Sequence, residues 1–243
     1  MSELLYYDEE SEWNKALLMY DAVLKEISTK LEILNNEFKL AHQYNPIEHI
    51  TSRIKSAQSI ARKIRIKGKE LTVENIIKYV NDVAGVRIIC SFTSDIYRIA
   101  KAIAKQDDVT VLQVKDYISE PKPNGYMSYH MIVAIPIFLS NDVVNTKVEI
   151  QIRTIAMDFW ASLEHKIYYK FDGKAPDGIR EELRECANII SFLDQKMLAI
   201  NESVKRYHED FNGGTAMNED SSTFMDEELP DSLKKLFGTV VSE

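Results

Sequence analysis

The sequence is poor in the features that mark secreted, zinc-binding and membrane proteins. Its 243 residues include only two cysteines, too few for a disulfide framework or a zinc site, so we expect Cys90 and Cys186 to be small buried hydrophobic residues. It has no apolar run of the roughly 18 residues that a membrane span needs. It begins Met1-Ser2-Glu3, without the basic and apolar leader of a signal peptide. These absences predict a cytoplasmic protein with no membrane partner.

Several well-known catalytic motifs are also missing. The chain has no Gly-rich Walker loop, no GxGxxG fingerprint, no HExxH zinc motif and no Ser, His and Asp set with an interpretable spacing. The enzyme classes that depend on these motifs therefore have no support.

Negative charge is concentrated at one end of the chain. The net charge is −8, and the segment from Glu209 onward holds nine acidic residues and two lysines, which accounts for seven of those charges. The rest is nearly neutral, and its positive charge gathers between Arg53 and Lys69. This distribution favours a local anion site over a nucleic-acid-binding surface that covers the whole protein.

The pattern of apolar residues divides the chain into four parts. Residues 1–44 carry a heptad stripe from Trp13 to Ala41 that fits a long helix, either packed on its own domain or also paired with another subunit. Residues 45–175 alternate strand-like and helical patterns, which predicts an α/β domain with a mixed sheet of about four or five strands flanked by helices. Residues 176–211 form a second long helix with a nearly heptad stripe, and residues 212–243 are an acidic, disordered tail.

A cationic helix face is predicted near the start of the central part. Asn45-Pro46-Ile47-Glu48 has the residue types of a helix start, and the isoleucines that follow recur at helical spacing. On the opposite side of this helix we expect Lys55, Ser59, Arg62 and Lys63, with Arg53 and Arg65 at the margins. The face is either simply solvated or binds phosphate groups.

The stretch from Thr146 to Arg153 is the most informative strand. Its alternation places three apolar side chains on one face and Glu149, Gln151 and Arg153 on the other. A carboxylate, an amide and a guanidinium in one row are either an ordinary solvent-facing strand side or a functional site.

Three further groups are candidates for a site. Asp82 stands at the entrance of a strongly apolar strand, which Arg87 interrupts. The loop of residues 120–130 contains two prolines, an Asn-Gly bend, and aromatic and basic side chains, as a ligand clamp does. His165 lies on the helix expected after Thr154, where it is either a packing residue or part of the site.

Two separate acids among basic and aromatic groups suggest a class of chemistry. Asp82 and Glu149 have the ligand type that Mg²⁺ prefers, and lysine and arginine surround phosphates in enzymes of phosphoryl transfer. The residue pattern alone reaches that class and no further.

Three motifs in order resemble the synthetase domain of the RelA/SpoT family. They are Asp82-Val83-Ala84-Gly85-Val86-Arg87, Gly125-Tyr126-Met127-Ser128-Tyr129-His130, and Glu149-Ile150-Gln151-Ile152-Arg153-Thr154 followed by Trp160 and Glu164-His165. From about Trp13 to Tyr207 the chain resembles the stand-alone small alarmone synthetases of the RelQ type. The resemblance implies a nucleotidyltransferase-like fold and the transfer of pyrophosphate from ATP to the ribose 3′-hydroxyl of GDP or GTP, which yields AMP and (p)ppGpp.

The resemblance also implies roles for individual residues. It makes Asp82 and Glu149 the Mg²⁺ ligands, with Glu149 also accepting the proton of the 3′-hydroxyl. The ATP site would consist of Arg53 and Arg87 on the adenine, and Lys55, Ser59 and Lys63 on the phosphates. The acceptor site would consist of Tyr126 stacked on guanine, with Lys122, His130 and Gln151. Further candidates are Arg62, Arg65, Lys67, Lys115, Arg153 and His165.

The chain departs from the family pattern in two places. The segment Arg65-Ile66-Lys67-Gly68-Lys69 is longer than expected, so the reach of its basic residues is open. Ser28, Glu32 and Asn35 stand where basic residues line an allosteric alarmone site in some relatives, so we expect weak or no activation by the product. The expected partners are the nucleotide substrates, other copies of the chain in a homo-oligomer with a tetramer favoured, and an RNA regulator. We expect no hydrolase activity, because no His-Asp pair precedes the synthetase region.

Three rival interpretations remain. A silent nucleotide- or RNA-binding sensor of the same fold would have lost the acids, and a different nucleotidyltransferase would show a Gly-Ser followed by closely paired aspartates. A purely structural coiled-coil role would leave the strand motifs unexplained.

Overall fold

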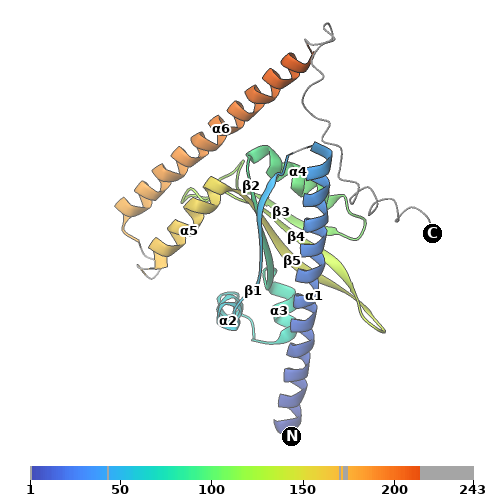
Figure 1. Cartoon of the computed structure of the whole chain (residues 1–243). Helices are drawn as coiled ribbons and strands as arrows, with labels where there is room; N and C mark the ends of the chain where they lie inside the picture. The colour runs from blue at the N-terminus through green and yellow to red at the C-terminus, as the bar shows by residue number, and fades with distance from the viewer. Residues whose placement is uncertain (1, 43, 170, 172–174, 214–243) are drawn as a thin grey trace, which may run out of the picture. The chain divides into compact units, whose positions relative to one another are not determined.

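A computed structural model of the chain describes residues 2–42, 44–169, 171 and 175–213 (Figure 1). Internal contacts divide the chain into one unit that ends at Ile200 and a second that begins at Asn201. The sheet, the candidate site and the first part of the last helix all belong to the first unit.

The first unit is built around a mixed five-stranded sheet in the order β1-β2-β5-β4-β3. The outer strands form two antiparallel pairs, β1 with β2 and β3 with β4. The central strand β5 joins these pairs, parallel to β2 and antiparallel to β4. The strands are β1 (Ile47–Ile54), β2 (Ala84–Cys90), β3 (Thr110–Asp116), β4 (Tyr129–Phe138) and β5 (Val143–Thr154).

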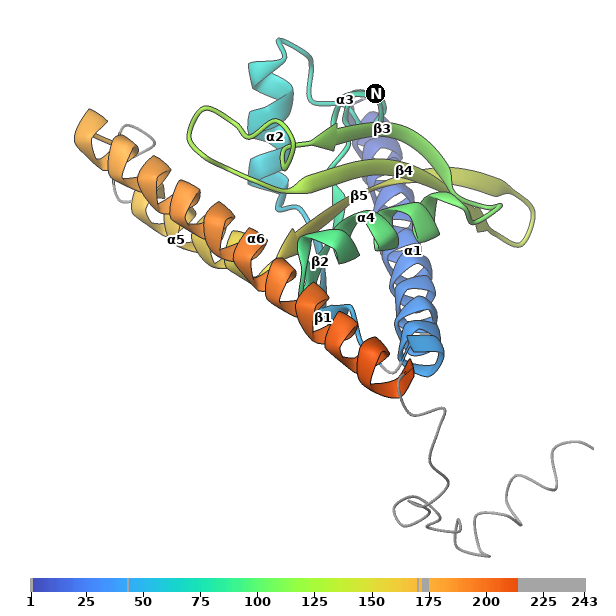
Figure 2. The same ribbon diagram turned by 90° about the horizontal axis from the view of Figure 1, so that it is seen from above.

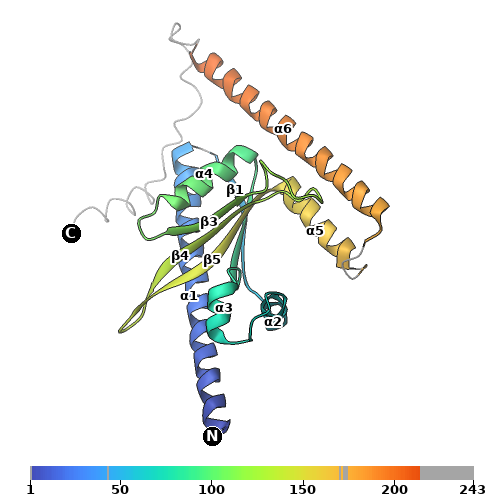
Figure 3. The same cartoon turned by 180° about the vertical axis from the view of Figure 1, so that it is seen from behind.

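Helices cover one face of this sheet and leave part of the other open. Both α1 and α4 pack on the strands, and Figure 2 shows them on the same side. In Figure 3 the strands pass in front of α1, so this view looks at the face that α1 leaves uncovered. The helices are α1 (Ser2–His42), α2 (Ala57–Ile66), α3 (Val73–Tyr79), α4 (Thr93–Ala104), α5 (Ile155–Tyr169) and α6 (Asp177–Gly213).

The heptad stripe of α1 packs on the sheet of its own chain. Tyr20, Ile27, Leu31 and Phe38 are buried in the same core cluster as the strand residues. The stripe therefore stabilises the domain by removing apolar surface from water, and it no longer argues for a second subunit.

The helix predicted from Pro46 onward was wrong over its first part. Residues Ile47–Ile54 form β1, which pairs along its length with β2, and the helix begins only at Ala57. Ser56 is the true N-cap, since its side chain accepts a hydrogen bond from the amide of Ser59. Tertiary pairing has overridden a local start signal, as it commonly does when propensities are weak.

The prediction that both cysteines are buried was half right. Cys90 lies in the core on β2, whereas Cys186 is exposed on α6. The mixed sheet of four to five strands flanked by helices is confirmed, with five strands. The acidic tail predicted from residue 212 lies outside the described residues except at its start.

Candidate active site

The polar face of β5 forms the floor of the candidate site. Val148, Ile150 and Ile152 are fully buried on the helix-covered face. Glu149, Gln151 and Arg153 alternate with them and point to the other face, as the sequence predicted. Because apolar packing on one face fixes the register, the polar side chains cannot slip to the core side.

Strand pairing lines up functional side chains in two rows across the sheet. In the first row Gln151 of β5 lies opposite Arg87 of β2 and His130 of β4, and Lys115 of β3 lies beyond His130. In the second row the partner of Glu149 is Gly85, and the partner of Gly85 is Arg53. The missing side chain at position 85 leaves room between Arg53 and Glu149.

Asp82 lies in the turn before β2 and holds two ammonium groups. Its Oδ2 accepts hydrogen bonds from Lys63 Nζ at 2.6 Å and Lys55 Nζ at 3.0 Å. Lys55 is fixed there because its amide donates to the carbonyl of Val83. Burial alone would raise the pKa of Asp82, but the two lysines outweigh it and lower the pKa below its usual value.

Glu149 is held through both of its carboxylate oxygens. Oε2 accepts from Gln151 Nε2 at 2.8 Å, and Oε1 lies 3.3 Å from His130 Nδ1. Burial raises the pKa of Glu149 and nearby Asp82 adds to this, but the contacts with His130 and Gln151 lower it by more. Both acids are therefore carboxylates at neutral pH.

The two carboxylates line one cleft with the arginines predicted to hold ATP. The cleft has a volume of about 150 Å³ and lies over β1, β2 and β5. Its walls are Thr51, Ser52, Arg53, Asp82, Gly85, Val86, Arg87, Glu149 and Gln151. Five residues predicted from distant parts of the sequence thus meet at one place.

This donor set fits a magnesium ion that is completed by substrate. Among the described residues no group of three or more His, Cys, Asp or Glu side chains could hold a metal alone. Asp82 Oδ1, however, is buried without a hydrogen-bond partner, which leaves an oxygen ligand beside Glu149. Mg²⁺ is usually bound by one or two carboxylates together with substrate phosphates, so Asp82 and Glu149 would hold it with a nucleotide present.

An aromatic cluster lies next to Glu149 on the β3–β4 side. The Tyr126 hydroxyl is 2.8 Å from His130 Nε2, and the Tyr117 and His130 rings meet edge to face. Lys122 Nζ is 4.6 Å from the ring centre of Tyr117 and 4.7 Å from that of Tyr126. A flat base stacked on Tyr126 would displace or share this ammonium contact.

The loop before β4 that carries Tyr126 is held by α5 and by the first part of α6. Asn124 Nδ2 donates to Glu164 at 3.0 Å, and Trp160 Nε1 donates to the Leu183 carbonyl at 2.8 Å. Gly125 has φ +87°, and a Cβ built there would lie 2.5 Å from Ala187 Cβ. Only glycine allows the loop to approach α6 this closely.

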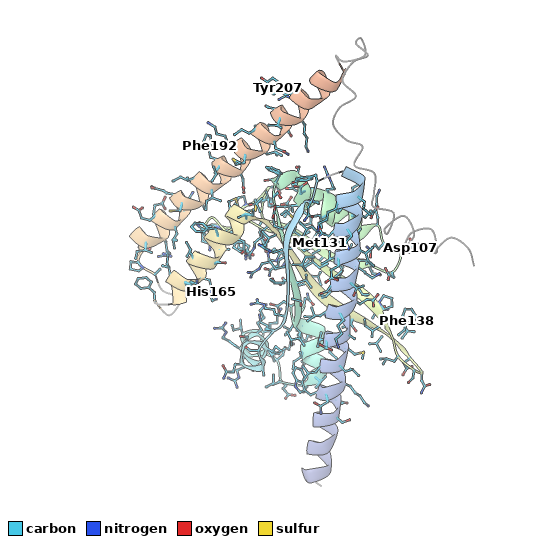
Figure 4. The ribbon with its side chains drawn as sticks, viewed as in Figure 1. Asp107, Met131, Phe138, His165, Phe192 and Tyr207 are labelled. Atoms are coloured by element: carbon cyan, nitrogen blue, oxygen red, sulfur yellow. The ribbon has the colours of Figure 1, made fainter. Side chains whose placement is uncertain are left out.

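The remaining predicted residues lie away from the cleft or at its margin. Arg62 and Arg65 are exposed on α2, and Lys67 is exposed just after it. Lys115 is exposed on the edge strand β3, at the end of the first row. His165 is exposed on α5, where Figure 4 labels it. Ser59 is half-buried on the first turn of α2, and its hydroxyl pairs with Ser56.

Two charged residues of the site were missed by sequence reasoning. Asp158 on α5 accepts from Arg153 Nη1 at 3.0 Å and lies 3.2 Å from Arg87 Nη1. Lys147 of β5 donates to Asn81 Oδ1 at 2.8 Å, beside the turn that carries Asp82. Lys147 continues the alternation of Glu149 and Gln151, so the same period would have found it. Asp158 lies four residues after Thr154, about one helical turn into the expected helix, and this spacing could have placed it near the end of β5.

Comparison with known proteins gives a consistent set of similarities. The sequence profile described as the region found in RelA / SpoT proteins matches residues 52–174. GTP pyrophosphokinase YwaC from Bacillus subtilis is 50% identical over 193 residues, which cover 79% of this chain and 92% of YwaC. GTP pyrophosphokinase YjbM from the same organism is 34% identical over 197 residues, 81% of this chain and 92% of YjbM.

Solved structures agree with the sequence comparison. The crystal structure of small alarmone synthetase 2 from Bacillus subtilis has a TM-score of 0.73 at 47% identity, and covers 79% of this chain and 99% of its own. Small alarmone synthetase 1 from Bacillus subtilis, bound to its product pppGpp, has a TM-score of 0.74 at 35% identity, with 80% and 99% covered. Among the described residues no helix has the length and apolar character needed to cross a membrane.

Proposed function

Because the chain belongs to the RelA/SpoT family, we propose that it is a (p)ppGpp synthetase that transfers the β,γ-pyrophosphate of ATP to the 3′-hydroxyl of GDP or GTP. The products are AMP and ppGpp or pppGpp. The relatives that carry this activity in their names match most of the chain, and the site contains the groups that such a transfer needs. We further propose that the enzyme works with Mg²⁺ in the cytoplasm.

The donor side of the site is formed by β1, β2 and α2. Arg53 and Arg87 are the groups that would hold the adenine between two guanidinium planes. Lys55 and Lys63 now neutralise Asp82. We expect the same ammonium groups to turn to the triphosphate when it enters, which frees Asp82 to act as a ligand. The lysines thus keep a buried carboxylate paired until substrate arrives.

The chemical step depends on Glu149. When bound, Mg²⁺ offsets negative charge on the phosphates and polarises them for attack. Glu149 is ionised, lies in the same cleft as Asp82, and is fixed through both oxygens. It can therefore orient the acceptor 3′-hydroxyl and take its proton as the new bond to phosphorus forms. AMP leaves when the bond between its phosphate and the β-phosphorus breaks.

The acceptor side is formed by the loop before β4 and by β4 itself. Tyr126 offers an aromatic face for guanine, and Lys122 offers a cation for the acceptor phosphates. His130 and Gln151 lie between this loop and Glu149. The donor and acceptor groups thus lie on opposite sides of the strand that carries the base.

The observation that best supports the proposal is that the ionised carboxylates of Asp82 and Glu149 line one cleft with Arg53 and Arg87, and that the aromatic cluster of Tyr126 lies next to Glu149. The test is to incubate the protein with Mg²⁺, γ-labelled ATP and either GDP or GTP, and to separate products by anion exchange. Label in a guanosine tetra- or pentaphosphate, with an equal amount of AMP, is the expected result. Intact nucleotide binding without any transfer would favour a silent sensor.

We also propose that the protein forms a homo-oligomer through α6. The later part of this helix exposes an apolar seam in which the residues alternate spacings of four and three, as in a coiled coil. The seam consists of Leu193, Met197, Ile200, Val204 and Tyr207, each about half or more exposed; Figure 4 labels Tyr207 near its end. A tetramer is the favoured assembly. The RNA regulator and the weak response to product stay predictions.

A further inference from the structure

Arg153 is the most completely buried charged group on the site face. Only 4% of the residue is exposed, and all three of its guanidinium nitrogens make hydrogen bonds. Nη1 donates to Asp158 at 3.0 Å, and Nε donates to Ser128 Oγ at 3.4 Å. Nη2 donates to the Tyr126 hydroxyl at 2.6 Å and to Gln151 Oε1 at 3.3 Å. A group engaged in this way is poorly placed to bind substrate, so its charge needs another explanation.

The contact with Tyr126 fixes the direction of a chain of hydrogen bonds. An arginine can only donate, so the Tyr126 oxygen must accept from Arg153, and its single hydrogen is left for His130 Nε2. On the other side of the ring the ionised Glu149 oxygen can only accept, so Nδ1 carries a proton, and in a neutral His130 the Nε2 atom is the acceptor for the Tyr126 hydroxyl. The Nδ1 proton faces Glu149 Oε1, 3.3 Å away. Arg153, through the Tyr126 hydroxyl, and Glu149 thus favour the same tautomer of His130 from the two ends of the chain.

The contact with Gln151 fixes a second chain in the same way. The amide oxygen of Gln151 accepts from Arg153, so its NH₂ group must point the other way. There it donates to Glu149 Oε2 at 2.8 Å. If the amide were reversed, two donors would meet at Arg153 and two acceptors at Glu149.

We infer that Arg153 is a positioning residue that orients both donors to Glu149, the Gln151 amide on one oxygen and the His130 imidazole, through Tyr126, on the other. Asp158 is the anchor of this arrangement, because it neutralises the buried guanidinium and fixes its plane. The inference rests on the proposed function, in which Glu149 receives the proton of the acceptor. It also gives Tyr126 a second role besides the proposed stacking, since its ring would contact the base while its hydroxyl belongs to this chain of hydrogen bonds.

The first test is Arg153→Lys in the full-length protein, with kcat and both KM values measured separately. Lysine keeps the positive charge but has no planar fork with which to hold Tyr126 and Gln151 together. We expect kcat to fall about 10–100-fold, the usual effect of losing a group that orients a ligating or reacting side chain. KM for ATP should stay within about threefold, and Tm measurements will show whether the fold is kept.

The second test is Tyr126→Phe, which keeps the ring and removes only the hydroxyl. The inference predicts a lower kcat with little change in the KM of the acceptor, because stacking depends on the ring alone. Tyr129→Phe is the matched control: it makes the same change three residues later, on the helix-covered face, where Tyr129 packs edge-on against Tyr97 of α4. A fall in kcat in the control equal to that in Tyr126→Phe would overturn the inference.

A third measurement needs no turnover. Nitrogen-15 NMR of protein labelled in its histidines distinguishes the Nδ1–H tautomer from the Nε2–H tautomer, and a His130→Asn sample assigns the signal. We expect His130 to be the Nδ1–H form in the wild type, and the Nε2–H form to gain population in both Arg153→Lys and Tyr126→Phe. An Nε2–H form in the wild type would contradict the inference.

The two levels of interpretation can be separated. If the wild-type protein transfers no pyrophosphate, the proposed function fails whatever the tautomer. If it does transfer pyrophosphate and Arg153→Lys keeps kcat and the His130 signal of the wild type, the function stands and the positioning role is wrong.

Discussion

At the scale of single residues, the neighbours of Glu149 determine its charge. Glu149 is largely buried, which works against its ionisation, yet His130 and Gln151 keep its pKa lower than that of a free glutamate. Glu149 is thus charged before substrate arrives, and it lines the cleft in which the substrate would bind. A base prepared in this way needs no rearrangement when the hydroxyl is bound.

Replacing Glu149 by glutamine tests this role directly. The amide keeps the shape of the side chain but can neither take a proton nor provide a carboxylate ligand, so at least ~3 kcal/mol of transition-state stabilisation should be lost. That corresponds to a fall of more than about 100-fold in kcat/KM. Calorimetry should show that GDP still binds. Turnover close to that of the wild type would remove Glu149 from the mechanism.

Individual contacts were the part of the site that the sequence could not supply. The alternation of β5 predicted which side chains share a face, and the structure confirms it. It could not show that Arg153 points sideways to Tyr126 and Asp158, because those contacts depend on how a loop and a helix pack around the strand. Residue type and spacing indicate a face; the partners of a buried charge follow only from tertiary structure.

At the scale of elements, α6 holds the acceptor loop through a glycine. Gly125→Ala places a methyl group 2.5 Å from Ala187 Cβ at a φ of +87°. We expect lower stability and a higher KM for the acceptor nucleotide, with a smaller effect on the KM for ATP.

Gly68→Ala is the matched control for this prediction. Gly68 also has a positive φ, of +64°, but nothing lies within 4 Å of its Cβ position. Gly68→Ala should lower the free energy of unfolding only by the backbone cost of a positive φ, roughly 1–2 kcal/mol. The further loss of stability in Gly125→Ala should be recovered in the double variant Gly125→Ala with Ala187→Gly, because the second change removes the methyl group that causes the clash. No difference between the two single variants would contradict the close packing.

A second link joins α6 to the end of β5. Thr154 Oγ1 donates to Asp194 Oδ2 at 2.7 Å, while burial raises the pKa of Asp194 above its usual value, against the effect of that hydrogen bond. The Asp194 carboxyl group therefore stays protonated to higher pH in the folded protein than in the unfolded chain. Stability falls as pH rises from the unfolded pKa of about 3.9 through the folded value, and the loss persists at neutral pH.

Asp194→Asn should remove this pH-dependent loss. Asparagine accepts the same hydrogen bond from Thr154 and does not ionise, so the Tm near pH 7.5 should rise above that of the wild type. The difference should shrink at pH 4, where the wild-type carboxyl is closer to its neutral form. Asp107→Asn changes an exposed carboxyl before β3 and should leave Tm almost unaltered. A lower Tm for Asp194→Asn at pH 7.5 would mean that the charge stabilises the link.

The elements also show where sequence reasoning fails. β2, β5, α5 and α6 were expected close to their observed positions, because their apolar patterns are clear. β1 was taken for helix, since Asn45-Pro46-Ile47-Glu48 fits a helix start and the isoleucines recur at intervals of three and four. The strand exists because β2 offers it a full set of backbone partners, which no local window can show.

At the scale of the whole molecule, the apolar seam of α6 predicts assembly. Leu193→Glu combined with Ile200→Glu places two charges on the seam, so it should lower the molar mass measured by light scattering. Gln195→Glu adds a charge at an exposed position of the same helix and should leave the mass unchanged. An unchanged mass in the double variant would show that any oligomer uses another surface.

The central position of β5 has a consequence for how the enzyme is made. The donor groups lie on β1, β2 and α2, and most of the acceptor groups lie on β4 and the loop before it; within the sheet, β5 lies between the two strand pairs and is hydrogen-bonded to both. Among the described residues β5 is also the last strand along the chain, and it carries Glu149, the proposed base. A nascent chain that has not yet reached β5 therefore lacks Glu149, Gln151 and the strand to which both pairs are hydrogen-bonded. A chain that ends before β5 cannot carry out the proposed transfer, because the strand that joins the two pairs is the same strand that supplies the proposed base.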